Sequence, residues 1–522
     1  MAGARTLHTT QPVEMDMEKK STKMWGGRFS KDIDSSILAW TESITVDSHL
    51  VAEDLWGSMA HVAMLGSQGI IPANNAAAIL DTLYKLQQDW IEGRWQWIPS
   101  QEDVHMNAEK MVIDALGMDV GGRMHTCRSR NDQVVLDSKL YARRRLLELR
   151  SRVVDAVEAL LKKAEAHKDD VMVSYTHVQH AQPVSVAYWL THYAGVLLRD
   201  LQRLKAAYDT TDQNPLGSGA IAGTSFPIDR QLTTDLMGFQ EVHLHGMDAT
   251  SSRDFMLESL SAATILQVTM SRLAEEFILW SSYEFRTLTL DDGFAMGSSM
   301  MPQKKNPGAL ELLRGRGGRA IGYLTAACTM MKGLPSGYNR DFHEDKELLV
   351  ATMELMNKAV QVVPPLINST TINLKRMEEL SWGNFANATE LANYLVAKHD
   401  VPFRRAHDIV GNENFSNTQF CFEHLKKWDI KAPESEVLAV LNPTHVMKTY
   451  TSLGATSPSS VSHIIDTYTA KLGEHRHVLQ TDQTRVKRAY DASRSLASEA
   501  AKVVHNKDDL VKLIQKYRPT SH

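Results

Sequence analysis

Apolar residues recur at helical spacing along most of this chain, in three long stretches, the first two of which contain neither glycine nor proline. One stretch runs from Gly122 to Pro183, and its apolar positions repeat as on one face of a helix: Leu140, Leu147, Val154, Val157 and Leu161. A second stretch lies between Gly246 and Gly293. A third begins at Pro307, where the first turn of a helix tolerates proline. We find no alternation typical of strands, so the pattern predicts an all-α protein.

The length of these stretches predicts a bundle. A helix of about 40 residues is about 60 Å long, which exceeds the diameter of an average compact domain. Helices of that length with one apolar face usually pack against partner helices, often from other subunits. We therefore expect a bundle of long helices within an oligomer.

Turn-forming residues concentrate in two loops, from Asn214 to Asp229 and from Asp291 to Pro307. The second loop contains GSSMMPQKKNP, in which two serines follow a glycine and two lysines and an asparagine precede the third helical stretch. Hydroxyl, ammonium and amide groups beside a helix N-terminus can hold a carboxylate. On residue types alone, a solvated serine and lysine loop is the other interpretation.

Composition narrows the function classes. The chain has 522 residues, of which 43 % are hydrophobic and 23 % charged, as in ordinary globular proteins. Its net charge of -5 provides no general basic surface for nucleic acid or anionic lipid. No apolar run approaches the roughly 18 residues of a membrane helix. We expect neither nucleic acid nor membrane as a partner, and an anionic substrate would need a local basic pocket.

The cysteines and the first residues favour the cytoplasm. Three widely spaced cysteines, Cys127, Cys328 and Cys421, match neither a disulfide framework nor a zinc site. Residues 1–23 lack the apolar core of a signal peptide, and their acidic residues argue against an organelle transit peptide. We interpret residues 1–23 as a disordered lead-in.

The GSSMMPQKKNP loop resembles the signature of the fumarate-releasing lyases, and its QKKNP ending is most similar to the argininosuccinate lyase version. Collinear segments from about Trp25 to about Val461 extend this resemblance: MWGGRFS (24–30), TESITVDSHL (41–50), SQEDVHMNAE (100–109), HTCRSRNDQVVLD (125–137), SYTHVQHAQPVS (174–185), NPLGSGAIAGTSFPIDR, MDATSSRDF, GLPSGYNRDFHEDKE, NYLVAKHDVPFRRAH and SLGATSPSSV. On these segments the chain is identified as a member of the argininosuccinate lyase family. Another lyase of the superfamily, such as adenylosuccinate lyase or fumarase, and a non-catalytic crystallin-like structural protein are the alternatives.

The resemblance implies an architecture and an activity. It implies three helical domains, with the central long-helix bundle assembling in a homotetramer whose active sites are shared between subunits. We place the N-terminal helical domain at residues 24–130, the central bundle at 131–380, and a C-terminal helical domain with an extended helical tail at 381–522. The implied reaction is the reversible elimination of argininosuccinate to L-arginine and fumarate, without metal or organic cofactor.

Such an elimination needs a base for a carbon-bound proton, an acid for the departing nitrogen, and positive charge near the carboxylate. By resemblance Ser298 is the carbon-side base, activated by neighbouring positive charge and loop dipoles. His177 is the second proton-transfer group and pairs with Glu311. Lys304 and Asn306 hold the carboxylate. Which of Ser298 and His177 is donor and which acceptor depends on the direction of reaction.

Further positions match residues that contact substrate in the family. Three of them match residues that bind the dicarboxylate half of the substrate: Arg130, Asn131 and Thr176. The other matching positions are Ser43, Asp103, Tyr338, His343 and Lys346, the last toward the amino-acid end. His343 stands where glutamine is usual, and Cys127 stands where glycine is usual.

Overall fold

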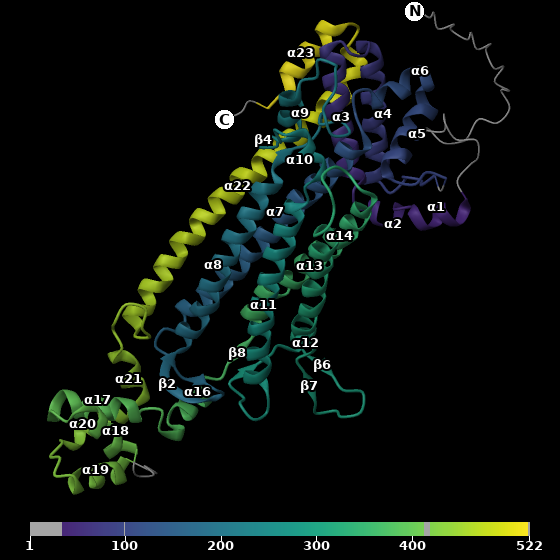
Figure 1. The fold of residues 1–522 in the computed structure, drawn as a ribbon. Coiled ribbons are helices and arrows are strands. Elements are labelled where there is room, and N and C mark those ends of the chain that lie inside the picture. Colours follow the sequence, from purple (N-terminus) through teal and green to yellow (C-terminus); the bar gives the residue numbers. More distant parts are fainter. Residues whose placement is uncertain (1–33, 99, 412–417, 520–522) are drawn as a thin grey trace, which may run out of the picture.

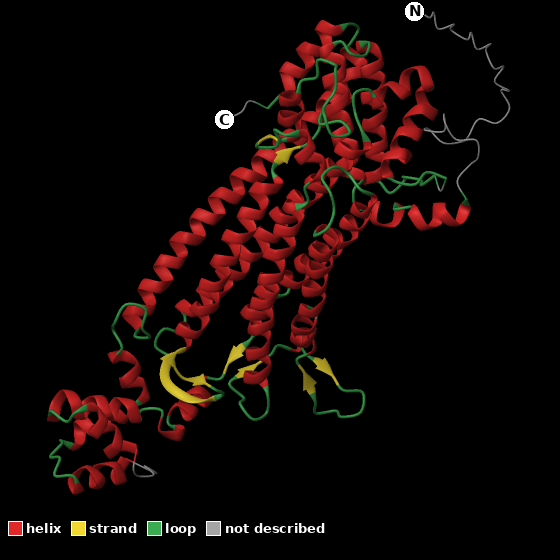
Figure 2. Cartoon of the chain, in the orientation of Figure 1, coloured by secondary structure: helices red, strands yellow, loops and turns green. Residues whose placement is uncertain are grey.

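The computed structural model describes residues 34–98, 100–411 and 418–519. The expected lead-in (1–23) and the segment MWGGRFS lie outside these residues. Long helices run side by side through the middle of the molecule, with a group of shorter helices at each end (Figures 1 and 2). The main helices of this bundle are α7 (Arg130–Glu165), α8 (Val186–Thr211), α11 (Asp254–Ser281), α12 (Gly308–Gly315), α13 (Gly317–Met331), α14 (His343–Gln361), α15 (Val363–Ser369) and α22 (Pro458–Val503).

The start of α7 is set by its own sequence. Ser129 and Asp132 form a capping box. The Ser129 side chain accepts a backbone N–H of the first turn, and the Asp132 side chain accepts the backbone N–H of Ser129. The predicted apolar stripe of this helix is buried at every position, against α8 on one side and other bundle helices around it. Helical periodicity therefore predicted this core element correctly.

The stretch from Gly122 to Pro183 is not helical to its end, because a short hairpin follows the long helix. After α7, β1 (Val171–Thr176) pairs antiparallel with β2 (Gln179–Ser185). His177 and Val178 form the turn between them, with φ of 56° and 60°. Positive φ at both central residues matches the twist of a hairpin but is uncommon without glycine, asparagine or aspartate, so the sequence carries no turn signal here.

Six further short strands form three small pairs in the described residues. They are β3 (Gln213–Asn214) with β4 (Glu241–Val242), β5 (Leu288–Thr289) with β8 (Thr371–Ile372), and β6 (Met296–Gly297) with β7 (Lys305–Asn306). The last pair closes the base of the GSSMMPQKKNP loop. The helical stretch that follows Pro307 is interrupted at Arg316, between α12 and α13.

One end of the bundle carries a group of helices from the first part of the chain. Its elements are α1 (Ser35–Thr41), α2 (Ile44–Asp47), α3 (Val51–Gln68), α4 (Ala73–Ile91), α5 (Val104–Leu116), α6 (Met118–Gly121) and the 3-10 helix η1 (Gly122–His125). Shorter elements join the bundle helices: α9 (Arg230–Met237), α10 (Gly246–Ser251), and the 3-10 helices η2 (Asp292–Phe294) and η3 (Arg340–Phe342).

The other end carries a small helical group with its own apolar core, centred on Leu391, Leu395 and Ile409. Its elements and their connection to the bundle are α16 (Leu374–Ser381), η4 (Gly383–Phe385), α17 (Ala388–His399), α18 (Phe403–Gly411), α19 (Thr418–Lys427), α20 (Glu434–Leu441) and α21 (Pro443–Thr449).

The tail returns along the whole bundle. Helix α22 packs on α7 and α8 and reaches α4, and α23 (Lys507–Tyr517) then packs on α3 (Figure 1). The tail is therefore helical, and it lies against the bundle and the first helical group. The domain boundaries stay a prediction. Among the described residues, none of the helices combines the length and apolar character that a membrane span requires.

Candidate active site

The residues expected in one site occupy opposite ends of the bundle within one chain. His177 on the β1–β2 hairpin, Ser298 and Lys304 in the β6–β7 loop, and Glu311 on α12 lie at one end (Figure 1). Thr176 and Asn306 belong to the same end, in β1 and β7. The remaining candidates lie at the other end, around α2, α5 and the first turns of α7 and α14: Ser43, Asp103, Arg130, Asn131, Tyr338, His343 and Lys346.

The second of these ends contains a buried ion pair. Lys346 Nζ lies 2.5 Å from Asp47 Oδ1 and donates to Ser43 Oγ at 3.0 Å. Ser43 Oγ in turn donates to Asp47 Oδ2 at 2.8 Å. Burial by itself would lower the pKa of Lys346, but Asp47 and the nearby Asp103 outweigh burial and raise it. Lys346 is therefore a fixed cation at neutral pH.

Asp103 caps α5 and lies near this ion pair. Its carboxylate accepts the backbone N–H of Met106 at 2.7 Å, which sets the start of the helix. Arg130 Nε lies 3.9 Å from Asp103 Oδ2, and the other end of the guanidinium lies 3.7 Å from Glu109. Burial would raise the pKa of Asp103, yet Arg130, His105 and the helix N–H together lower it. A carboxylate and a guanidinium thus face each other without a close bond, which leaves both able to contact a charged ligand.

Three more candidates complete this end. Asn131 donates its amide to the carbonyl of Ala220 at 3.0 Å, so it connects the start of α7 to the turn-rich loop of residues 214–229. The Tyr338 ring lies edge-on to Phe342, with centroids 5.6 Å apart. Burial, with Lys346 and Arg340 nearby, lowers the pKa of His343, so its imidazole is neutral at physiological pH. A neutral imidazole can donate one hydrogen bond, as the usual glutamine can.

The opposite end presents an open loop. Ser298 Oγ accepts the backbone N–H groups of Met301 at 3.0 Å and Met300 at 3.3 Å. Lys304 is exposed, whereas Lys305 forms an ion pair with Asp292 at 2.5 Å. His177 and Glu311 are exposed too. Within the described residues, no hydrogen bond or ion pair joins any two of His177, Ser298, Lys304 and Glu311.

Comparison with known proteins identifies the family. The model of the family described as "Lyase" matches residues 27–322, and that described as "Argininosuccinate lyase C-terminal" matches residues 385–448. The chain is 42 % identical over 461 residues to the argininosuccinate lyase of Geobacillus thermodenitrificans, which covers 86 % of this chain and 99 % of the relative. The chain belongs to the argininosuccinate lyase family. The argininosuccinate lyase of Listeria monocytogenes is similar as well, with 45 % identity over 397 residues, 76 % of this chain and 87 % of the relative.

Solved structures share the fold of this chain. An EDDS lyase variant with bound fumarate superimposes with a TM-score of 0.76 at 25 % identity, covering 93 % of this chain and 95 % of that one. The class II fumarase of Schistosoma mansoni has the same fold, with a TM-score of 0.64 at 15 % identity, covering 76 % of this chain and 91 % of that one. The all-α prediction, with its long-helix bundle, is confirmed apart from the short strands.

Two residues near the argininosuccinate lyase candidates were missed from the sequence. Asp47 holds both Lys346 and Ser43, and Glu109 lies beside Arg130. Both belong to segments that carry the family resemblance. Asp47 follows Ser43 at the spacing of one helical turn, which places the two on one face and was the available signal.

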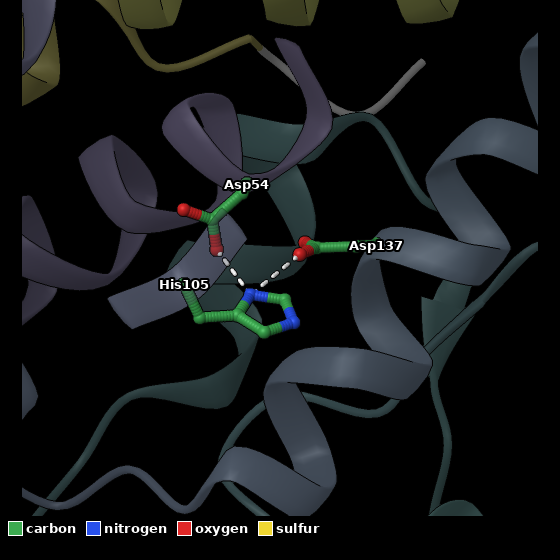
Figure 3. Close-up of side chains that lie close together, drawn as sticks. All are labelled: Asp54, His105 and Asp137. Atoms are coloured by element: carbon green, nitrogen blue, oxygen red, sulfur yellow. Dashed lines mark hydrogen bonds and ion pairs between the residues drawn. The ribbon is translucent and has the colours of Figure 1, made fainter. Parts of the chain in front are cut away.

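One buried cluster in this family member resembles a cation site. In the described part of the chain, Asp54, His105 and Asp137 bring a ring nitrogen and two carboxylates together (Figure 3). Both contacts go to the same nitrogen, His105 Nδ1, at 2.8 Å from Asp54 and 3.2 Å from Asp137. An N–H that donates to a carboxylate has no lone pair for a metal. The carboxyl groups favour the protonated ring, so we interpret the cluster as an imidazolium between two carboxyl groups.

Proposed function

We propose that the protein is an argininosuccinate lyase that converts argininosuccinate reversibly to L-arginine and fumarate. The observation that carries this proposal is the 42 % identity to a curated argininosuccinate lyase over 99 % of that relative's length. The chain also retains His177, Ser298, Lys304 and Glu311 in their expected segments.

The open loop supports the role of Ser298 as the carbon-side base. A serine hydroxyl is a weak base, because its alkoxide is unstable in water. Two backbone N–H groups already point at Ser298 Oγ, and they would stabilise negative charge there. The alkoxide would take the proton from carbon, the C–N bond would break with its electron pair going to nitrogen, and His177 would return a proton to that nitrogen. Lys304 would stabilise the charge that builds on the carboxylate.

The buried end supplies the other half of the site. Arg130 and Asn131 would bind the dicarboxylate part, and Thr176 from the hairpin would join them. Lys346, held by Asp47, would face the carboxylate at the amino-acid end, and Asp103 could accept a guanidinium. Ser43, Tyr338 and His343 provide further hydrogen-bonding groups there.

We also propose a homotetramer in which different subunits supply the two halves. Helix α11 has 28 residues and spans about 42 Å, so one chain cannot place both of its ends on one small substrate. Large apolar side chains on α11, α12 and α13 are exposed in the single chain: Ile265, Val268, Leu312 and Ile321. Such exposed apolar positions on long helices suit packing against other copies.

A fumarate assay tests the function. Purified protein should release fumarate, read by its ultraviolet absorbance, from argininosuccinate and not from adenylosuccinate or malate. Release from another of these substrates would favour a different lyase of the superfamily. No release from any of them would favour a non-catalytic, crystallin-like role. The scarce, widely spaced cysteines favour a cytoplasmic location, which fractionation of cells would check.

A further inference from the structure

Behind the buried half of the proposed site lies a group of three fully enclosed side chains. Asp54 comes from α3, His105 from α5 and Asp137 from α7, and each is at most 1 % exposed. Figure 3 shows both carboxyl groups directed at the same edge of the imidazole. The group therefore joins the three helices α3, α5 and α7. Asp103 caps the start of α5, and Arg130 is the first residue of α7.

Burial and mutual contacts shift the pKa values of all three side chains. Burial would lower the pKa of His105, but Asp103, Asp137 and Asp54 together raise it to about 10. Burial raises the pKa of Asp137 well above its usual value, and the charge on Asp54 raises it further. The pKa of Asp54 is lowered despite burial, by its hydrogen bond and charge interaction with His105. The contacts and these shifts indicate an imidazolium at His105 beside the Asp54 carboxylate, while Asp137 holds a proton more tightly than an ordinary aspartate.

The imidazolium lies close to the substrate site. His105 is in the first turn of the helix that Asp103 caps. Its charge is one of those that lower the pKa of Asp103, after that of Arg130. Asp54 and Asp137 both contact the ring at Nδ1, and the side chain is 1 % exposed, so the ring is held in place.

We propose that His105 is a positioning residue, whose buried imidazolium, held by Asp54 and Asp137, keeps Asp103 ionised and fixed opposite Arg130. This inference rests on the proposed lyase function, and it adds a role that the family motifs do not describe. His105 touches no reacting atom and acts through Asp103.

The charged groups around Asp103 set the expected pH dependence. The Asp47 carboxylate, which accepts the backbone N–H of Val104 at 3.2 Å, opposes the ionisation of Asp103. Arg130 on α7, His105 on α5 and Lys346 on α14 favour its ionised form. Glu109 opposes ionisation, and His343 is neutral near pH 7. Removing the cation at His105 therefore raises the pKa of Asp103, because two of the three favourable charges remain and one is lost.

The test compares His105→Gln with a matched control, His61→Gln. His61 is another enclosed histidine. Its Nε2–H donates to the Thr126 carbonyl at 2.9 Å, and burial lowers its pKa to about 3, so its ring is neutral. Both variants lose a buried ring, while only the first loses a charge. We expect His105→Gln to raise KM for argininosuccinate about tenfold or more, with a smaller change in kcat. It should also move the acid limb of kcat/KM about one pH unit upward, and His61→Gln should leave that limb in place.

A double-mutant cycle with Asp103→Asn tests whether His105 acts through Asp103. If His105 acts through Asp103, adding His105→Gln to Asp103→Asn raises KM no further. Independent, additive effects would overturn the proposal, as would an unmoved acid limb in His105→Gln. If His105→Gln does not fold, Asp54→Asn replaces it and should shift the limb in the same direction, because it weakens the charge on the imidazole. An inactive wild-type protein would refute the proposed function. In that case the affinity for L-arginine is measured by calorimetry at several pH values. His105→Gln should move the pH at which this affinity is lost upward by about one unit.

Discussion

Mixing two inactive variants provides the sharpest test of a site shared between subunits. Asn131 lies at the buried end of the bundle and Ser298 in the open loop at the other end. Arg253, just before α11, forms an ion pair with Asp345, next to Lys346, while the Ser298 loop follows the far end of α11. With 28 residues at about 1.5 Å each, α11 separates these ends by about 42 Å. One substrate can therefore contact both residues only if they come from different chains.

The expected recovery follows from random assembly. Asn131→Ala and Ser298→Ala homo-oligomers should each keep a few per cent of activity or less. An equal mixture, denatured and reassembled, should regain about one quarter of the wild-type activity, because each intact residue has a chance of about one half of entering a given site. The assay is fumarate release after reassembly, with light scattering to confirm the oligomer. Each variant reassembled alone is the control for refolding losses.

The result can refute the reasoning directly. If one chain supplied both residues, every site in a mixed oligomer would carry one defect. Oligomers that re-form without regaining activity would then rule out sharing between these two positions.

The other predictions concern single residues in the loops. Ser298→Ala should lower kcat at least about 100-fold while Ser299→Ala has a much milder effect, and equal effects in steady-state assays would mean that the wrong serine has been assigned. Lys304→Met should lower kcat as well as raise KM, because charge increases on the carboxylate in the transition state, and a change in KM alone would make Lys304 a ground-state binding residue. Cys127 has a φ of 65°, a conformation that a β-branched side chain disfavours. Cys127→Val should therefore lower the free energy of unfolding by about 1–2 kcal/mol in urea titrations, while Cys127→Gly should not lower it. Equal stabilities of the two variants would show that the backbone at Cys127 is unstrained.

Local sequence determined the long helices and the chemistry of the loops. The stripe on α7 needed only helical periodicity, and its capping box lies within four consecutive residues. The GSSMMPQKKNP loop identified Ser298 and Lys304 because its groups are contiguous in the chain. The separate roles of these residues still depend on the resemblance to a family, since a solvated loop has the same composition.

Only the tertiary structure decided which distant residues meet. The hairpin that carries His177 was missed because its turn holds ordinary residues at positive φ, a conformation that surrounding structure imposes and short-range preference does not predict. Lys346 meets Asp47 across 299 positions of sequence. His105 meets two carboxyl groups from other helices, and burial together with these contacts shifts the pKa values of all three side chains. A sequence lists the residue types that can titrate, but pKa values depend on distance and desolvation, which exist only once the chain has folded.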